Sequence, residues 1–219
     1  RLNLMPVPRM AWRDEGVRRI LRLMAPAMFG VSVSQINLLL DTVLASLLQT
    51  GSVTWLYYSD RLVELPLGVF AIAIGTVILP SLSGKHAGDD PQAFSRTLDW
   101  ALKLVLLIGV PAALALAVIA EPLLATLFNH GEFGANDVLR SAESLRAYSA
   151  GLVAFMLIKI LAPGYFARQD TRTPVKIGII AMVANMALNL ALIWPLQHAG
   201  LALATSLSAW LNAGLLYIG

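Results

Sequence analysis

Four side chains that can bind charge lie at helical spacing inside an apolar stretch: Tyr57, Asp60, Arg61 and Glu64. Positions i, i+3, i+4 and i+7 share one face of a helix, so Arg61 lies at the centre of this face. One charged side chain at the centre of a membrane helix costs about 2.5–3.5 kcal/mol, so the face must meet protein or water. Since a fixed guanidinium is a bidentate partner for phosphate, the spacing predicts an anion-binding face.

The alternative interpretation of this charged face is an ion pair that only fixes helix packing. A triad with two carboxylates and one guanidinium is net negative, which makes it a poor stabiliser and favours the functional interpretation. Pro66 follows within one turn and removes a backbone hydrogen bond, so we expect a kink or hinge at about mid-membrane.

A second set of polar residues carries only oxygen ligands. Asp41 lies in an early apolar block with Asn37, and Thr205 lies in the last such block, one turn after Leu201. A carboxylate, amide oxygens, a hydroxyl and a main-chain carbonyl suit Na⁺ or another alkali cation. Interhelical hydrogen bonds between polar side chains, each contributing about 0.6 kcal/mol, are the alternative. The candidate ligands are Asp41, Asn185, Asn189, Leu201 and Thr205.

The elements that must position these residues are helices in a bilayer. The 219 residues are 58% hydrophobic and 13% charged, and the apolar residues are gathered in blocks long enough to cross about 30 Å of hydrocarbon. Backbone groups in lipid must pair within their own segment, so the fold class is all-α and polytopic. Six spans are predicted, at approximately 24–48, 53–79, 100–120, 144–166, 175–194 and 199–219.

The distribution of Lys and Arg predicts the orientation of these spans. Eleven Lys and Arg residues lie in or beside segments 1–23, 80–99 and 167–174, against only Arg140 and Arg146 on the opposite side. By the positive-inside rule, those three segments face the cytoplasm. Residues 1–23 form a basic lead-in, which is either an amphipathic helix on the inner leaflet or an ordinary linker. The chain begins at Arg1 and stops within an apolar run, so we expect a piece of a longer polypeptide.

Several function classes find no support in the sequence. There is no P-loop, nucleophile elbow or HExxH motif, so we expect a transporter and no enzyme. The net charge of +3 is too small to indicate nucleic acid, and the chain has no cysteine for thiolate metal sites. His86, His130 and His198 lie in or beside connectors, where we expect them at the surface.

Three long motifs carry a family resemblance. The stretches GSVTWLYYSDRLVELPLGV, LFNHGEFGANDV and LAPGYFARQDTRTPVKI resemble the MurJ (MviN) family of lipid II flippases, and the similarity runs over nearly the whole chain. The DTRTP motif alone is also similar to the drug-exporting MATE branch of the same MOP exporter superfamily. The resemblance implies fourteen helices in two six-helix lobes around a cavity plus a final pair. This chain would be the second lobe, residues 24–219, without the first lobe or the last two helices.

The resemblance also assigns roles to residues. Arg61 matches a cavity arginine of the family and would engage the diphosphate of lipid II, with Asp60, Glu64 and Tyr57 beside it. Asp41, Asn185, Asn189, Leu201 and Thr205 are similar in placement to a sodium site of some members; no other cofactor is implied. The remaining helices of the same polypeptide would complete the cavity, so this lobe alone should not transport.

The function implied is movement of lipid II from the cytoplasmic to the periplasmic leaflet of the bacterial inner membrane, by alternating access, for peptidoglycan synthesis, cell wall biogenesis and cell shape. Membrane lipids and lipid II are the expected partners, and no nucleic acid is expected. The alternatives are a MATE-like cation or drug antiporter, a flippase of another polyprenyl-linked oligosaccharide, a membrane-embedded transferase and a structural scaffold.

Overall fold

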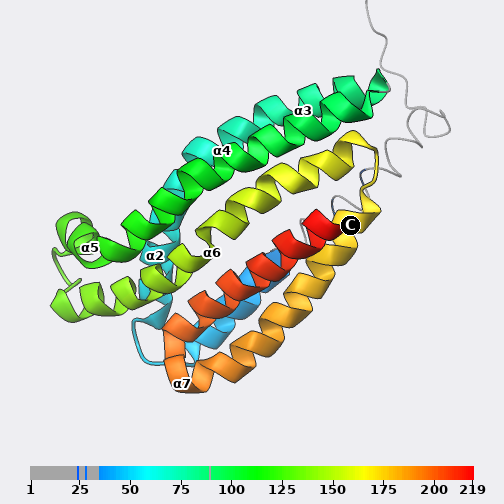
Figure 1. Ribbon diagram of the computed structural model, residues 1–219. Coiled ribbons are helices and arrows are strands. Elements are labelled where there is room, and N and C mark those ends of the chain that lie inside the picture. Colours follow the sequence, from blue (N-terminus) through cyan, green and yellow to red (C-terminus); the bar gives the residue numbers. More distant parts are fainter. Residues whose placement is uncertain (1–23, 25–27, 29–34, 89) are drawn as a thin grey trace, which may run out of the picture.

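The computed structural model describes residues 24, 28, 35–88 and 90–219 as a bundle of helices (Figure 1). The basic lead-in predicted at 1–23, and much of the first part of the 24–48 span, lie outside these residues. Residues 35–46 are helical, and a turn at 47–51 leads into the next helix. Within the described residues no strand occurs, which confirms the all-α fold class.

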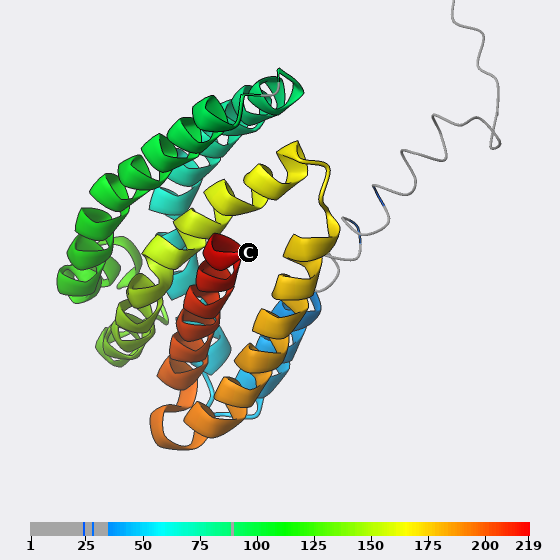
Figure 2. The same ribbon diagram turned by 45° about the vertical axis from the view of Figure 1, so that its right-hand side comes forward.

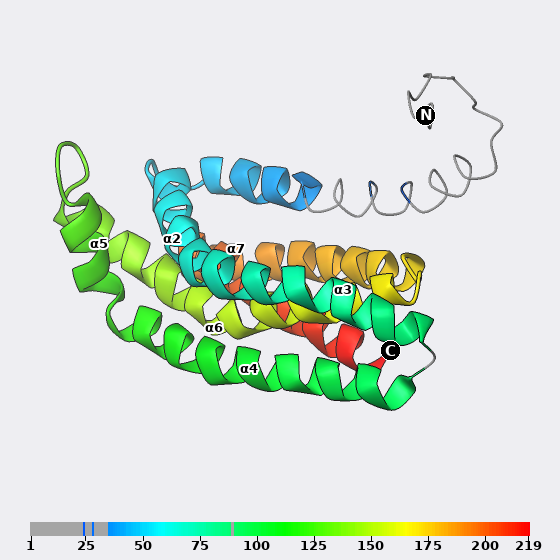
Figure 3. The ribbon, with the colours of Figure 1, turned by 90° about the horizontal axis from the view of Figure 1, so that it is seen from above.

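The second membrane crossing is one long rod with a bend. It consists of α2 (Ser52–Pro66), the π-helix η1 (Leu67–Ile72) and α3 (Ala73–Ala87), and Figure 3 shows α2 and α3 running in different directions. Pro66 keeps helical dihedrals, with φ −65° and ψ −34°, and the wide turns begin directly after it. A proline without an N–H disturbs the hydrogen-bond ladder, and π-turns accommodate such a disturbance. A bend therefore follows Pro66 and is spread over η1, and the hinge predicted there stays a prediction.

Helix α6 (Ala135–Ala167) is the central helix of the bundle. It packs against α2, α3, α4 and α5 on one side and α7 on the other (Figures 1 and 2). Small residues let α7 approach closely: a Cβ on Gly151 would lie 2.6 Å from Oγ of Ser206. Ser206 donates to the carbonyl of Ala147 at 2.7 Å, and Trp210 Nε1 donates to the carbonyl of Ala150 at 2.8 Å. Close backbone approach and side-chain hydrogen bonds are how helices associate without a water-driven hydrophobic effect.

Helices α4 (Pro91–Val118) and α5 (Ala120–Phe128) are separated only by Ile119, and a loop joins α5 to α6. The Asp90 carboxylate caps α4 by accepting the N–H of Ala93 at 2.8 Å. At the other link, Asp170 accepts the N–H groups of Arg172 and Thr173 before α7 begins. Hydrogen bonds from Thr173 hold the pKa of Asp170 below its usual range.

Helix α7 (Arg172–Ile218) is two membrane arms joined by a sharp turn. Gln197 has φ 51° and ψ −129°, two residues after Pro195, which lacks a backbone donor. The turn also needs Gly200, because a Cβ there would lie 2.3 Å from the carbonyl oxygen of Leu192. The first arm and the last arm then lie side by side (Figure 2).

Six crossings result within the described residues: segment 35–46, the α2–η1–α3 rod, α4, α6 and the two arms of α7. Four of the helices, with α7 taken as one, are individually long and apolar enough to span a membrane. The multi-pass architecture predicted from the apolar blocks is thus confirmed. The helices run beyond most predicted spans, because helices continue past the hydrocarbon into the interface.

Candidate functional site

The charged face of α2 has Arg61 at its centre. Its Nη1 lies 2.5 Å from Oε2 of Glu64, and its guanidinium carbon lies 5.0 Å from the ring centroid of Tyr57. Both contacts join neighbours on one helical face, so they are made within α2 and need no other element. The pair fixes the guanidinium and leaves its remaining N–H donors free for a ligand.

This face is exposed in the described lobe. The side chain of Arg61 is 51% exposed and that of Glu64 48%, whereas Ser59, Leu62 and Val63 on the opposite face are buried against the bundle. The Asp60 carboxylate is half-buried and, among the described residues, has no ion pair, so Arg61 pairs with Glu64 alone. Arg61 lies nine residues after Ser52, about 14 Å into the rod. A guanidinium at such depth requires water or protein against it.

The predicted oxygen ligands come together at a second place, between segment 35–46 and both arms of α7. Asn189 Nδ2 donates to Asp41 Oδ1 at 2.6 Å and to Asn185 Oδ1 at 3.0 Å. Thr205 Oγ1 lies 3.4 Å from Asp41 Oδ2 and donates to the carbonyl of Leu201 at 3.0 Å. Figure 3 shows the segment and the first arm running side by side. All five residues named from the sequence therefore lie in one connected cluster.

This oxygen cluster has the chemistry of a cation site. Asn185 and Asn189 are fully buried, and the oxygen Oδ1 of Asn189 has no hydrogen-bond donor. Oδ1 of Asn37, one turn before Asp41, is also buried without a donor. Within the described part of the chain, no Lys, Arg or His forms an ion pair with Asp41. Unpaired buried oxygens beside an unbalanced carboxylate fit a small monovalent cation such as Na⁺.

Sequence reasoning missed part of this cluster and all of a neighbouring one. Ser208 Oγ accepts a hydrogen bond from Asn185 Nδ2 at 3.4 Å. Its position three residues after Thr205, on the same helical face, could have indicated that it belongs to the cluster. The neighbouring cluster consists of Trp55, Asp137 and His198. It joins the start of α2 to α6, because Trp55 Nε1 donates a hydrogen bond to Asp137 Oδ1 at 2.7 Å. The ring of Trp55 meets that of His198 edge-on at 4.9 Å.

The expectation of a surface histidine at position 198 is wrong, since His198 is 1% exposed. The turn in α7 folds this ring inward, where its Nε2 lies 3.0 Å from the carbonyl oxygen of Arg140. A pattern of residue types along the chain could not indicate the direction of that turn. His130 is exposed as expected.

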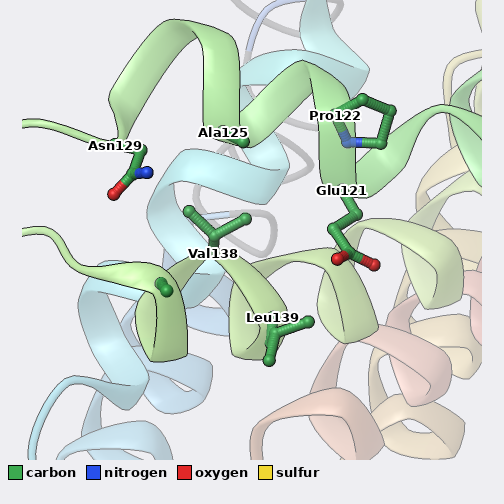
Figure 4. A pocket seen from close by; sticks show the side chains of 7 residues that line it. Glu121, Pro122, Ala125, Asn129, Val138 and Leu139 are labelled. Atoms are coloured by element: carbon green, nitrogen blue, oxygen red, sulfur yellow. The ribbon is translucent and has the colours of Figure 1, made fainter.

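A pocket of about 320 Å³ lies between α5 and α6, away from both sites. Figure 4 shows Asn129 at one end and Glu121 with Pro122 at the other, with Val138 and Leu139 between them. Glu121 also lies 3.7 Å from Arg146 in an ion pair. None of the candidate site residues lines this pocket, although Asn129, Ala135 and Val138 of its lining belong to the LFNHGEFGANDV motif.

Comparison with known proteins establishes the family. The model of the family described as lipid II flippase MurJ matches residues 1–219. The chain belongs to the MurJ family. It is 61% identical over 99% of its length to the probable lipid II flippase MurJ of Haemophilus influenzae, and 46% identical over 97% to the lipid II flippase MurJ of Burkholderia cenocepacia. It spans 44% and 41% of these two relatives, less than half of each.

Solved structures agree with the MurJ assignment. A lipid II flippase MurJ in an inward closed conformation superposes with a TM-score of 0.82 at 28% identity, over 94% of this chain and 44% of that one. An outward-facing MATE family multidrug transporter of the MOP superfamily gives a TM-score of 0.81 at 19% identity, over 97% and 47%. The second likeness shows the shared fold alone. This MurJ-family chain therefore has the fold of slightly less than half of each of these two transporters.

Proposed function

We propose that this chain is one lobe of a flippase that moves lipid II from the cytoplasmic to the periplasmic leaflet of the bacterial inner membrane. Family membership and the names of its relatives support this proposal. The substrate's charged head cannot cross hydrocarbon, so a carrier must offer it a polar path that opens to each side in turn. The remaining helices of the longer polypeptide would form the other wall of that path.

The observation that carries the proposal is the exposed guanidinium of Arg61. It is held by Glu64 and Tyr57 on a face that no other described helix covers. Diphosphate oxygens would bind the free N–H donors of Arg61 in the bidentate geometry that guanidinium groups favour. Glu64 orients the guanidinium, and the Arg61–Glu64 pair is itself neutral, which lowers the cost of a vacant site. Arg61 is thus the residue of this lobe that contacts the substrate head.

The test replaces Arg61 by Ala in the full-length protein and asks whether it supports growth of a strain depleted of its own flippase. We expect complementation to be lost while the protein remains folded in the membrane, because the diphosphate loses its bidentate partner. Arg140→Ala is the matched control: Arg140 also pairs with a glutamate three residues later, at 3.5 Å from Glu143, but lies near the start of α6. Growth with Arg61→Ala equal to that with Arg140→Ala would exclude Arg61 as the substrate contact.

We further propose that Na⁺ binds the oxygen cluster of Asp41, Asn185, Asn189, Thr205 and the Leu201 carbonyl. The unpaired Oδ1 of Asn189 and the unbalanced Asp41 carboxylate support it. Bound Na⁺ would supply a positive charge that ties segment 35–46 to both arms of α7. The Asp41 carboxylate would balance the charge of Na⁺, and the amide and hydroxyl oxygens would complete its coordination shell.

A further inference from the structure

Two adjoining cavities lie where α3 and α6 end and α4 begins, at the end of the bundle that the charge distribution assigns to the cytoplasm. The first, about 300 Å³, lies among Lys85, the start of α4 and Arg168. The second, about 420 Å³, is lined by Lys85, Arg96, Thr97 and Trp100. Lys85 therefore lines both cavities, and we call the two together the basic hollow.

Two of the cations of the basic hollow, Lys85 and Arg168, are held by neighbouring side chains. Nζ of Lys85 is hydrogen-bonded to Oγ1 of Thr97, between the two cavities. The guanidinium of Arg168 lies over the ring of Phe94 at 4.8 Å, and Phe94 is itself buried. Cations fixed by neighbours lose less conformational freedom on binding an anion than free surface lysines do.

The charge of the basic hollow favours an anion. Among the residues that the structure describes, its lining carries Lys85, Arg96 and Arg168 and the carboxylate of Asp90. One oxygen of Asp90 is already engaged by the N–H of Ala93, as the cap of α4. The hydroxyl of Ser95, also in the lining, can donate to an oxyanion. Fixed cations with a hydroxyl donor are the groups that recognise a phosphate.

The surroundings identify the source of that phosphate as a lipid. Trp100 is 57% exposed at the edge of the hollow, as tryptophans at a membrane interface are. Leu107, Val110, Leu114 and Val118 continue from it along α4, and all are exposed. These positions repeat at three, four or seven residues and so share one face of α4, along which acyl chains can lie. A headgroup in the hollow would thus have its tails beside an apolar stripe.

We infer that the basic hollow binds the phosphate headgroup of an anionic phospholipid of the cytoplasmic leaflet, distinct from the substrate that Arg61 contacts. Basic pockets between membrane helices at this level hold lipid headgroups by the same interactions. The inference rests on the topology in the proposed function, but not on lipid II transport. A bound lipid would bridge α3, α4 and the end of α6.

The test measures phospholipid retained by the full-length protein, by native mass spectrometry after equal titration with phosphatidylglycerol or phosphatidylcholine. We expect the wild type to retain phosphatidylglycerol preferentially. The combined variant Lys85→Gln, Arg96→Gln, Arg168→Gln should lower this preference roughly tenfold, since each cation near an anionic lipid contributes to its binding. The matched control removes three exposed cations at the same end that do not line the hollow: Lys103→Gln, Arg172→Gln, Lys176→Gln.

Three outcomes would overturn the inference. Equal retention of the two lipids by the wild type would show that no anion selectivity exists. An equal loss in the control variant would show that only the summed charge of this end matters. Displacement of phosphatidylglycerol by millimolar inorganic phosphate would assign the hollow to a soluble anion. Because none of these measurements involves transport, loss of the lipid site and failure of the flippase proposal are separate results.

Discussion

At the scale of residues, both candidate sites are marked by ionisable side chains that lie inside apolar segments. Asp41 and Arg61 were recognisable in the sequence because an ionised group inside an apolar block needs a partner. The partners of Asp41 were also predictable, since amides and hydroxyls are the oxygen donors available in such blocks. The approach of Ser208 and the burial of His198 were not, because both depend on where α7 turns.

The sodium proposal predicts a cation-specific stabilisation of the full-length protein. Replacing Na⁺ by K⁺ at constant ionic strength should lower the thermal midpoint of the wild type, because a ligand at one hundred times its Kd stabilises by about 2.7 kcal/mol. In Asp41→Asn the midpoint should become independent of Na⁺. Asp99→Asn is the control, since its carboxylate pairs with Lys103 at 2.6 Å on the surface of α4. Equal Na⁺ dependence in both variants would contradict the site.

At the scale of elements, helix existence could be predicted but helix contacts could not. Apolar length sets each crossing, and the break after Pro66 follows from the missing N–H. The sequence did not indicate that the break takes the form of a six-residue π-helix, or that α6 would be central. The central position of α6 depends on small residues where α6 contacts α7, and the closest approach there is Gly151 against Ser206.

This contact predicts that Gly151→Ala destabilises the protein. A Cβ there would lie 2.6 Å from Oγ and 2.7 Å from Cα of Ser206, so α6 and α7 must separate, at a cost of about 1–3 kcal/mol for overpacking. Thermal unfolding of the full-length protein measures the effect. Gly178→Ala provides the comparison, because nothing lies within 4 Å of its added Cβ and a helical Gly→Ala change is otherwise favourable by about 0.5–1 kcal/mol. Similar midpoints for the two variants would show that the close approach is unimportant.

At the scale of the whole molecule, charge is distributed unequally between the two ends of the bundle. Lys85, Arg96, Arg168, Arg172 and Lys176 lie at the end where α3 meets α4 and α6 meets α7. At the opposite end Arg140 and Arg146 are each paired with a carboxylate, at 3.5 and 3.7 Å. The charge distribution therefore predicts an orientation of the bundle in the membrane. The surface that would meet further helices could not be predicted, because it depends on residues outside this chain.

The orientation predicts opposite accessibility of two introduced thiols. This chain has no cysteine, so Glu132→Cys in the α5–α6 loop and Gln92→Cys at the start of α4 can each be made in a full-length protein without other cysteines. In intact cells with a permeable outer membrane, an impermeant maleimide should label Cys at 132 and leave Cys at 92 unmodified until the inner membrane is opened. The reverse pattern would invert the topology and the location assigned to the basic hollow.

The wide turns between Leu67 and Ile72 have a mechanical consequence. A π-turn holds an additional residue relative to an α-turn, and each residue advances an α-helix by about 100°. Tightening η1 by one residue would therefore rotate the Arg61 half of the rod by about a quarter turn relative to α3, while nearly every backbone hydrogen bond is kept. Such a rotation would change the direction of the Arg61 guanidinium without unfolding any part of the helix.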